Sequence, residues 1–214
     1  MLTFLGGDPI WRAKAAQEVE GLLRQYDTPL PKSNLDSDPS KTHTPSLSSR
    51  LARIPLEAWE TQTPVLDAII RETTRVAQPH TAMRRNLGPN LYIEDKIVPS
   101  GAYVIYPFSD VHLDESIYPD PWKFDPSRPE PDAGTTPFGY VGWGGGRTVC
   151  LGTRLAKVEL KLVAAMVVEA FEYGVVDGAG APTPVPTPNW NDILLCRPPK
   201  GSFALGYKRR AVEL

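Results

Sequence analysis

The sequence has 214 residues, of which 41% are hydrophobic, and its 23 basic and 25 acidic side chains give a net charge of -2. This length indicates one domain or part of a larger one, and the near-neutral charge argues against a dedicated nucleic-acid binder, because such proteins neutralise phosphates with a basic surface. Two cysteines, Cys150 and Cys196, are too few for a disulfide-stapled secreted scaffold and favour a reducing compartment, although one bridge is arithmetically possible.

The first residues resemble neither an export signal nor a membrane anchor. The run MLTFLGGDPIW is apolar but short, and it lacks a basic lead-in and a small-residue cleavage site. Asp8 and Pro9 are typical of an N-cap and a first helical position, and apolar residues follow them at helical spacing. The pattern predicts a helix over 9–25.

A polar segment over 28–49 separates this helix from the next elements. It is rich in Pro, Ser, Thr, Lys and Asp, and it has too few apolar residues to offset the entropy of ordering the chain. We expect a disordered or exposed loop there. Helical turns are expected at 51–54 and 55–59, and the apolar period after Pro64 predicts a helix over 64–77.

Short β-prone pieces follow between 81 and 107, separated by Gly-Pro and Pro-Ser-Gly. The strands expected in this stretch are 81–85, 91–93 and 103–107. A segment crowded with proline, aromatic and acidic residues, 118–137, has neither a helical nor a strand period. We expect it to form an ordered but irregular meander.

The last third of the chain combines a glycine cluster with one more helix. A cysteine-containing loop covers 142–152, and apolar residues at intervals of three and four predict a helix over 153–171. Four prolines between 182 and 188 indicate an extended turn. A weak terminal hairpin is expected over 193–205.

Cys150 is the candidate reactive residue of this loop. It follows three glycines and Arg147, and it lies two residues before Gly152, close to the start of the predicted helix. A thiolate there would be stabilised by the helix N-terminus and by the arginine, and glycines let the backbone approach a flat ligand. The alternative interpretation is a small buried hydrophobic residue after a turn, which is the commoner role of a lone cysteine.

Four segments in order decide between these interpretations. WGGGRTVCLG contains Trp143 and Cys150, and it has an aromatic residue, glycines, a basic residue and a Cys-x-Gly ending. ETTR runs from Glu72 to Arg75 as a Glu-x-x-Arg helix segment, KFDPSR ends in Arg128, and VPSGAYVIYPFSDVHLDESIYPDPWKF connects the two. Together these segments resemble the C-terminal part of the cytochrome P450 family of haem-thiolate monooxygenases.

The resemblance implies both a fold and a site. The implied fold is mainly α with small β-sheets (α+β), of which this chain would form an incomplete, C-terminal portion of the P450 fold. Glu72, Arg75 and Arg128 would form a structural triad that holds the meander under the haem loop; independently of the resemblance, the first two can pair because they are three apart on one helix. Haem b is the implied cofactor and Cys150 the axial ligand of its iron, with further implied haem contacts from Trp143, Gly144, Gly146, Gly152, Arg84 and Arg147.

Four positively charged or titratable residues need separate treatment. Arg84 and Arg85 are both candidates for a haem propionate, because a guanidinium binds a carboxylate bidentately, and by the resemblance Arg84 is the better match. Many family members place such a cation two residues before the cysteine, where this chain has Thr148, so a propionate contact from Arg147 departs from the pattern. His112 is interpreted as structural and not as a ligand.

The resemblance also implies an activity. The expected reaction is insertion of one oxygen atom of O2 into a small apolar organic substrate, with electrons from an NADPH-dependent reductase. The cysteine loop and the helix after it resemble fungal members, which often act in secondary metabolism on terpenoids, sterols or polyketides. The alternatives are an inactive truncated remnant and a non-catalytic haem-binding protein. We expect the chain alone to bind haem weakly and not to hydroxylate.

A phosphate-binding loop is the competing class, and GWGGGRT does not support it. The segment fits neither the Gly-Lys-Ser/Thr of a P-loop nor Gly-x-Gly-x-x-Gly. Localisation stays open at this point: no anchor is written in this chain, whereas complete eukaryotic relatives are bound to the endoplasmic reticulum membrane.

Overall fold

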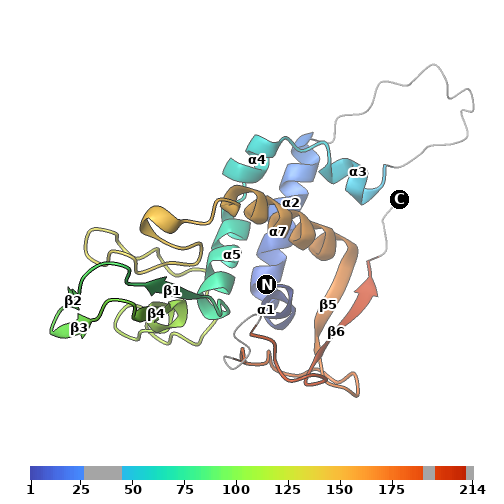
Figure 1. The fold of residues 1–214 in the computed structure, drawn as a ribbon. Coiled ribbons are helices and arrows are strands. Elements are labelled where there is room, and N and C mark those ends of the chain that lie inside the picture. Colours follow the sequence, from blue (N-terminus) through green and yellow to red (C-terminus); the bar gives the residue numbers. More distant parts are fainter. Residues whose placement is uncertain (27–44, 190–195, 211–214) are drawn as a thin grey trace, which may run out of the picture. The chain divides into compact units, whose positions relative to one another are not determined.

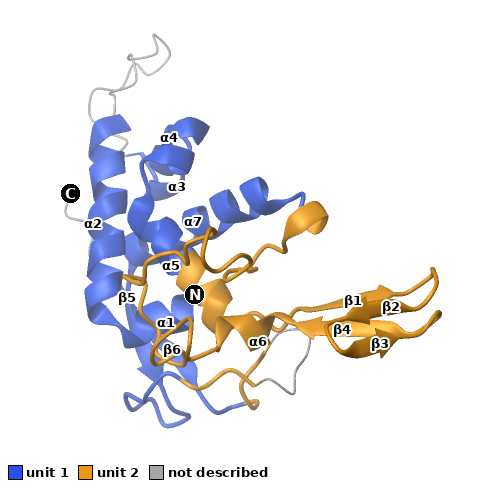
Figure 2. Ribbon diagram, turned by 90° about the vertical axis from the view of Figure 1, so that its left-hand side faces the viewer, with its two compact units in different colours: residues 1–70, 151–185, 201–214 blue, residues 71–150, 186–200 orange. Residues whose placement is uncertain are grey.

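The computed structural model describes residues 1–26, 45–189 and 196–210 (Figure 1). These residues belong to two compact units, each assembled from separate stretches of the chain (Figure 2). Unit 1 comprises residues 1–70, 151–185 and 201–214, and unit 2 comprises residues 71–150 and 186–200. Within the described ranges, no helix has the length and apolar character that crossing a membrane requires.

Unit 1 is built around two long helices, α2 (Pro9–Tyr26) and α7 (Thr153–Ala170), which pack against each other. Asp8 acts as the N-cap of α2, because its carboxylate accepts hydrogen bonds from the backbone N–H groups of Ile10 and Trp11. The buried face of α2 consists of Ala15, Val19, Leu22 and Leu23, and α7 contributes Ala164, Ala165 and Val168.

Three short helices complete the helical part of unit 1: α1 (Leu2–Gly7), α3 (Leu47–Leu51) and α4 (Leu56–Thr61). The structure corrects the prediction in two of them. The expected loop over 28–49 ends too late, since Ser46 caps α3 through its hydroxyl and its helix starts at Leu47; residues 27–44 lie outside the described part of the chain. Helix α1 was not predicted, because six residues are too few to show a helical period.

Helix α5 (Pro64–Val76) begins at the predicted residue and ends one residue before the predicted end. Its N-terminus in unit 1 is capped from a distant part of the sequence. The Glu18 carboxylate accepts the backbone N–H groups of Val65 and Leu66 at 2.8 and 3.0 Å. These are two of the donors that a helix start leaves without a partner inside the helix.

The buried lysine Lys161 ties α7 to the same region of unit 1. Its Nζ donates to the backbone oxygen of Trp59 at 2.7 Å and to the Asp67 carboxylate at 2.9 Å. The lysine side chain is 2% exposed. A charge this deeply buried is tolerated because both partners satisfy it.

The sheet of unit 1 consists of β5 (Phe171–Val176) and β6 (Ala204–Arg209), which pair antiparallel from Phe171–Arg209 to Val176–Ala204. This overturns the expected terminal hairpin over 193–205, of which 193–195 lie outside the described residues. Phe171 also starts the strand instead of ending the helix. The alternating buried residues Tyr173 and Val175 of β5 stabilise this pairing. No local pattern near β5 reveals the pairing, because β6 lies far along the chain.

Unit 2 contains two small antiparallel ribbons. Strand β1 (Thr81–Arg85) pairs with β4 (Tyr103–Pro107), and β2 (Leu91–Ile93) pairs with β3 (Lys96–Val98). The bounds of β1, β2 and β4 coincide with the sequence expectation, whereas β3 and the short helix α6 (Phe108–His112) were not expected. The segment 118–137 contains turns and bends but neither helix nor strand, as expected of a meander.

Candidate haem-binding site

A buried carboxylate, Glu72, organises one end of unit 2. The side chain of Glu72 is 3% exposed, and that of its helical neighbour Arg75 is 2% exposed. Arg75 Nε donates to one Glu72 carboxylate oxygen at 2.8 Å and its Nη2 to the other at 2.7 Å. This bidentate geometry is the strong form of an arginine–carboxylate pair.

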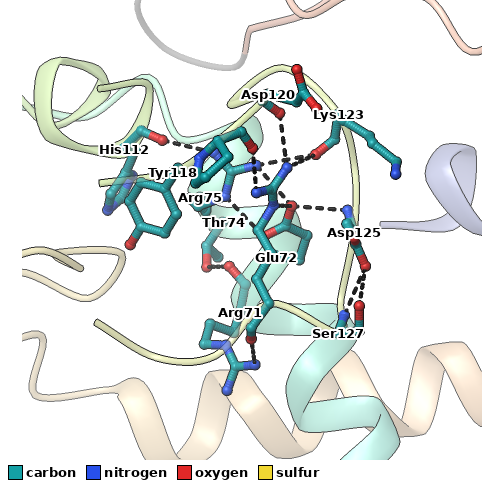
Figure 3. Close-up of polar contacts among 12 residues, drawn as sticks. Arg71, Glu72, Thr74, Arg75, His112, Tyr118, Asp120, Lys123, Asp125 and Ser127 are labelled. Atoms are coloured by element: carbon teal, nitrogen blue, oxygen red, sulfur yellow. Dashed lines mark hydrogen bonds and ion pairs between the residues drawn. The ribbon is translucent and has the colours of Figure 1, made fainter. Parts of the chain in front are cut away.

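The meander reaches the same carboxylate from 53 to 56 positions further along the chain (Figure 3). Arg128 Nε lies 3.3 Å from Glu72 Oε1, and the backbone N–H of Asp125 donates to that oxygen at 2.9 Å. The remaining Arg128 nitrogens donate to the backbone oxygens of Pro119, Asp120 and Lys123. One carboxylate and one guanidinium therefore fix the path of an irregular segment.

Arg75 extends this cluster toward α6. Its Nη1 donates to the backbone oxygen of His112 at 2.7 Å, and its Nη2 to that of Lys123 at 3.2 Å. The guanidinium lies over the ring of Tyr118, 4.8 Å from its centroid, and the Tyr118 hydroxyl donates to the backbone oxygen of Gly139. Burial raises the pKa of Tyr118 to about 12, so this phenol stays a hydrogen-bond donor at neutral pH.

His112 connects α6 with the segment that leads into the cysteine loop. The backbone N–H of Val141 donates to His112 Nε2 at 2.9 Å, and the imidazole stacks on Tyr140 with ring centroids 5.3 Å apart. Tyr140 and Thr74 share a hydrogen bond of 2.6 Å between their hydroxyls. His112 is fully buried, as befits the structural role expected for it.

The cysteine loop is held by backbone hydrogen bonds and one required glycine. The N–H of Cys150 donates to the backbone oxygen of Trp143 at 2.7 Å, which closes the loop. Gly144 has a φ of +86°, and a Cβ at this position would lie 2.5 Å from the backbone oxygen of Thr148. Only glycine meets both conditions without strain. Gly146 also has a positive φ and opens a single 3₁₀ turn that ends at Thr148.

Unit 2 contains a cavity of about 790 Å³ next to this loop. Cys150 is exposed at its wall, whereas Cys196 is buried, and no disulfide joins the two. Phe138 also lines the cavity and is 60% exposed, which is unusual for a large apolar ring. The cavity walls include Ala82, Arg84, Tyr106, Phe108, Val111, Phe138, Val141, Trp143, the glycines from 142 to 146, Thr148 and Cys150.

The candidate arginines of this site differ in whether they line the cavity. Arg84 lines the cavity and its Nη1 donates only locally, to the backbone oxygen of Met83. Arg85 is turned to the backbone oxygen of Gly101 and to the ring of Tyr103. Arg147 is exposed and is not among the residues that line the cavity; Gly152 belongs to unit 1 and does not line it either. Trp143, Gly144 and Gly146 do line it.

Comparison with known proteins decides the family. Residues 54–205 match the family model for cytochrome P450. The chain belongs to the cytochrome P450 family. It is 31% identical over 189 residues to the cytochrome P450 monooxygenase AacuE of Aspergillus aculeatus, which covers 86% of this chain and 35% of that protein. It is 32% identical over 180 residues to the cytochrome P450 monooxygenase dmxR5 of a Cryptosporiopsis species, covering 83% and 32%.

A solved structure supports the same fold. The cyanobacterial P450 CYP120A1, solved with retinoic acid bound, matches 97% of this chain and 40% of its own with a TM-score of 0.65 and 25% identity. This match bears out the expected fold class, a mainly helical P450 portion with small sheets. The chain spans about a third of the length of the curated relatives named above. The P450 family takes haem b as cofactor, and its members generally act on organic substrates with electrons from a redox partner.

The residues at the cavity fit a haem group. In the described part of the chain, no three His, Cys, Asp or Glu side chains gather as a metal site. The exposed Cys150 thiol offers a ligand for a haem iron beside the glycines that line the cavity. Phe108, Phe138 and Val141 supply apolar walls, and Arg84 supplies a cation for a carboxylate.

Sequence reasoning did not find two residues that hold this site. Gln78 donates from its Nε2 to the backbone oxygen of Gly142 at 2.8 Å, and it lines the cavity. Tyr140 stacks on His112 and bonds Thr74. Their hydrogen bonds join residues that are 64 and 66 positions apart in the sequence, and no local pattern predicts such contacts. The aromatic run just before the glycine cluster was the one available signal for Tyr140.

Proposed function

We propose that this chain carries the thiolate side of a haem-b site and works as part of a cytochrome P450 monooxygenase. The observation that carries the proposal is the exposed Cys150 at the wall of an apolar, glycine-lined cavity. A cysteine with only a packing role would be buried, as Cys196 is. The family match and the two fungal monooxygenase relatives support the same reading.

The chain's own residues have separate tasks in this proposal. Cys150 would bind the iron as thiolate, and Trp143, which lines the same cavity and whose backbone oxygen accepts the Cys150 N–H, would tune its electron density. Gly144 lets the loop turn where a Cβ would meet the backbone oxygen of Thr148, and Gly146 supplies a second positive φ in the same loop. Arg84 pairs with a propionate, whereas Arg147 stays at the surface. Glu72, Arg75 and Arg128 hold the meander in place.

Haem supplies the chemistry that no side chain offers. When haem b is bound, O2, two electrons and two protons convert a substrate C–H bond to C–OH and release one water. Cys150 would supply the thiolate ligand of that haem. The electrons come from an NADPH-dependent reductase, and the substrate is a small apolar organic molecule of the terpenoid, sterol or polyketide kind. The similarity to the fungal P450 monooxygenases AacuE and dmxR5 supports a role in secondary metabolism.

The absorption spectrum of the reduced, carbon-monoxide-bound protein tests the proposal. The purified chain is loaded with haem and compared with Cys150→Ser and with the matched variant Cys196→Ala. We expect a red-shifted thiolate Soret band in the unaltered chain and in Cys196→Ala, and its loss in Cys150→Ser. A spectrum that does not depend on Cys150 contradicts the assignment. A Cys150-dependent band without product formation, when reductase and NADPH are supplied, identifies a haem-binding protein without oxygenase activity.

A further inference from the structure

The ring nitrogens of His112 have different surroundings. Nε2 accepts the Val141 N–H, so this nitrogen carries no proton and the neutral ring holds its proton on Nδ1. Nδ1 is buried and has no hydrogen-bond partner among the described residues. A buried donor without a partner carries a free-energy cost. That cost is tolerable only where the rest of the ring contributes a compensating contact, which here is the bond to Val141.

Val141 begins a short chain of fixed peptide groups that ends at Cys150. Its N–H is bound by His112, and its own oxygen accepts the Gly144 N–H at 2.8 Å. The next oxygen, on Gly142, accepts from Gln78, and the following one, on Trp143, accepts the N–H of Cys150 at 2.7 Å. Two side chains bind these peptides: Gln78 binds Gly142, and His112 binds the first peptide, at Val141.

The charges around His112 favour its neutral form. Arg75 donates to the His112 backbone oxygen, and its positive charge lies close to the ring. The only carboxylate of the cluster, Glu72, is already bound by Arg75 and Arg128. Tyr140 stacks on the ring without ionising, since burial raises its pKa. Burial and Arg75 together lower the pKa of His112 to about 4, so at neutral pH Nε2 remains free to accept.

We propose that His112 is a positioning residue for the thiolate loop: its Nδ1–H tautomer holds the Val141 peptide and thereby couples the buried Glu72–Arg75 cluster to the loop that presents Cys150. This inference rests on the proposed haem-thiolate function for its consequence. The hydrogen bond itself is tested without haem. In this proposal the acceptor nitrogen Nε2 holds the Val141 peptide, and stacking of the ring on Tyr140 alone is not sufficient to hold it.

The first test uses the unaltered 214-residue chain in the absence of haem. Nitrogen-15 chemical shifts of labelled histidine distinguish the Nδ1–H from the Nε2–H tautomer, and hydrogen exchange of labelled valine reports on the Val141 amide. We expect the Nδ1–H tautomer and an exchange rate at Val141 far below that of an unprotected amide. An Nε2–H tautomer, or a Val141 amide that exchanges as freely as an exposed one, overturns the proposal whatever the haem chemistry turns out to be.

The second test compares two variants that divide the properties of the ring. His112→Gln keeps an acceptor oxygen near the position of Nε2 but loses the ring, whereas His112→Phe keeps the ring and loses the acceptor. We expect Val141 exchange to rise about tenfold or more in His112→Phe and to change much less in His112→Gln. After haem loading, the thiolate band should persist in His112→Gln and fall to a minor fraction in His112→Phe, in favour of a band without thiolate ligation.

The outcomes of the second test separate the two proposals. A thiolate band that persists in both variants, or that survives only in His112→Phe, contradicts the positioning role. Loss of the band in both variants also contradicts it, because the retained acceptor then fails to rescue. If the unaltered chain gives no thiolate band, the haem-thiolate function fails, and the tautomer and the Val141 exchange rates still decide whether His112 holds this loop.

Discussion

Glu72 concentrates more hydrogen-bond donors than any other carboxylate in unit 2 that the structure describes. Two guanidinium groups and one backbone N–H share its two oxygens, although the Glu72 side chain is only 3% exposed. The attraction in such a site is large, but so is the cost of removing the charges from water. Removing one partner therefore has a much larger effect than the net contribution of the pair.

Glu72→Gln tests this asymmetry with almost no change of shape. The variant leaves Arg75 charged and buried without a counter-ion, and we expect the free energy of unfolding to fall by about 3 kcal/mol or more. Urea unfolding followed by far-ultraviolet circular dichroism measures the change. The matched control is Glu130→Gln, whose carboxylate pairs with Arg71 but is 71% exposed, and which should cost less than about 1 kcal/mol. Equal costs would show that burial of Glu72 is not what matters.

His112 gives the stability of the protein a pH dependence of known sign. The unfolded chain binds a proton at this histidine below the ordinary pKa of 6.5, whereas the folded chain binds it only near the lowered value of about 4. Between these values the unfolded state holds more protons, so the free energy of unfolding decreases as the pH falls. The full effect is about 3 kcal/mol, complete near pH 4 and not present above 6.5.

Urea unfolding at several pH values between 4 and 7 measures this effect as a difference between two proteins. The comparison with His112→Gln is needed because burial also raises the pKa values of Glu18 and Glu169, which therefore contribute their own pH dependence. The unaltered chain should lose more stability than the variant on going from pH 6.5 to 4. The same slope in both proteins would mean that His112 takes up its proton equally in the folded and unfolded states.

At the scale of elements, the contacts that begin helix α5 come from a distant part of the sequence. Helix α5 starts at a Thr-Pro pair, and its first free N–H groups are bound by Glu18 of α2, 47 and 48 positions earlier. The carboxylate also places negative charge at the positive end of the α5 dipole. Burial raises the pKa of Glu18, and the two N–H bonds oppose that shift.

Glu18→Gln removes this cap while preserving the size of the side chain. An amide has one acceptor oxygen in place of two, so one N–H of α5 loses its partner and the favourable charge at the helix start disappears. We expect a loss of about 1–2 kcal/mol in the free energy of unfolding. Glu20→Gln is the matched control on the same helix, because Glu20 is exposed and pairs with Arg24; its cost should stay below about 0.5 kcal/mol.

The elements that could be predicted from the sequence are those with a strong local pattern. Strands 81–85, 91–93 and 103–107 are bounded by glycine and proline, and the apolar period of α5 has a proline at its start. Glu72 and Arg75 could be paired because three residues on a helix bring side chains together. Cys150 was identifiable because the glycines and the basic residue around it form a recognisable loop.

The elements and contacts that sequence reasoning could not reach depend on partners elsewhere in the chain. Strand β5 was not predicted, and its first residue was assigned to the preceding helix, because nothing near Phe171 reveals that Arg209 will pair with it. The bonds from Val141 to His112 and from Gln78 to Gly142 are of the same kind. Tertiary packing decides such contacts, and it overrides the local preference of short segments.

At the scale of the whole molecule, haem should act as a stabilising ligand. A ligand that binds only the folded chain stabilises it by about 2.7 kcal/mol at a free concentration 100 times its dissociation constant. We expect a concentration-dependent rise in the thermal unfolding midpoint of the unaltered chain, and a much smaller rise in Cys150→Ala. An equal rise in both would place the stabilising contact of haem outside the cysteine loop.

Unit 1 is assembled from separate stretches of the chain, and this affects how it folds. Helix α1, at residues 2–7, contacts β5, and β5 finds its only described partner strand in β6, after residue 203. Unit 1 therefore depends on contacts between the segments 2–7, 171–176 and 204–209, which lie far apart in the sequence. Such a high contact order requires long loops to close before any long-range contact rewards them, which makes slow, late assembly the expected folding route of this unit.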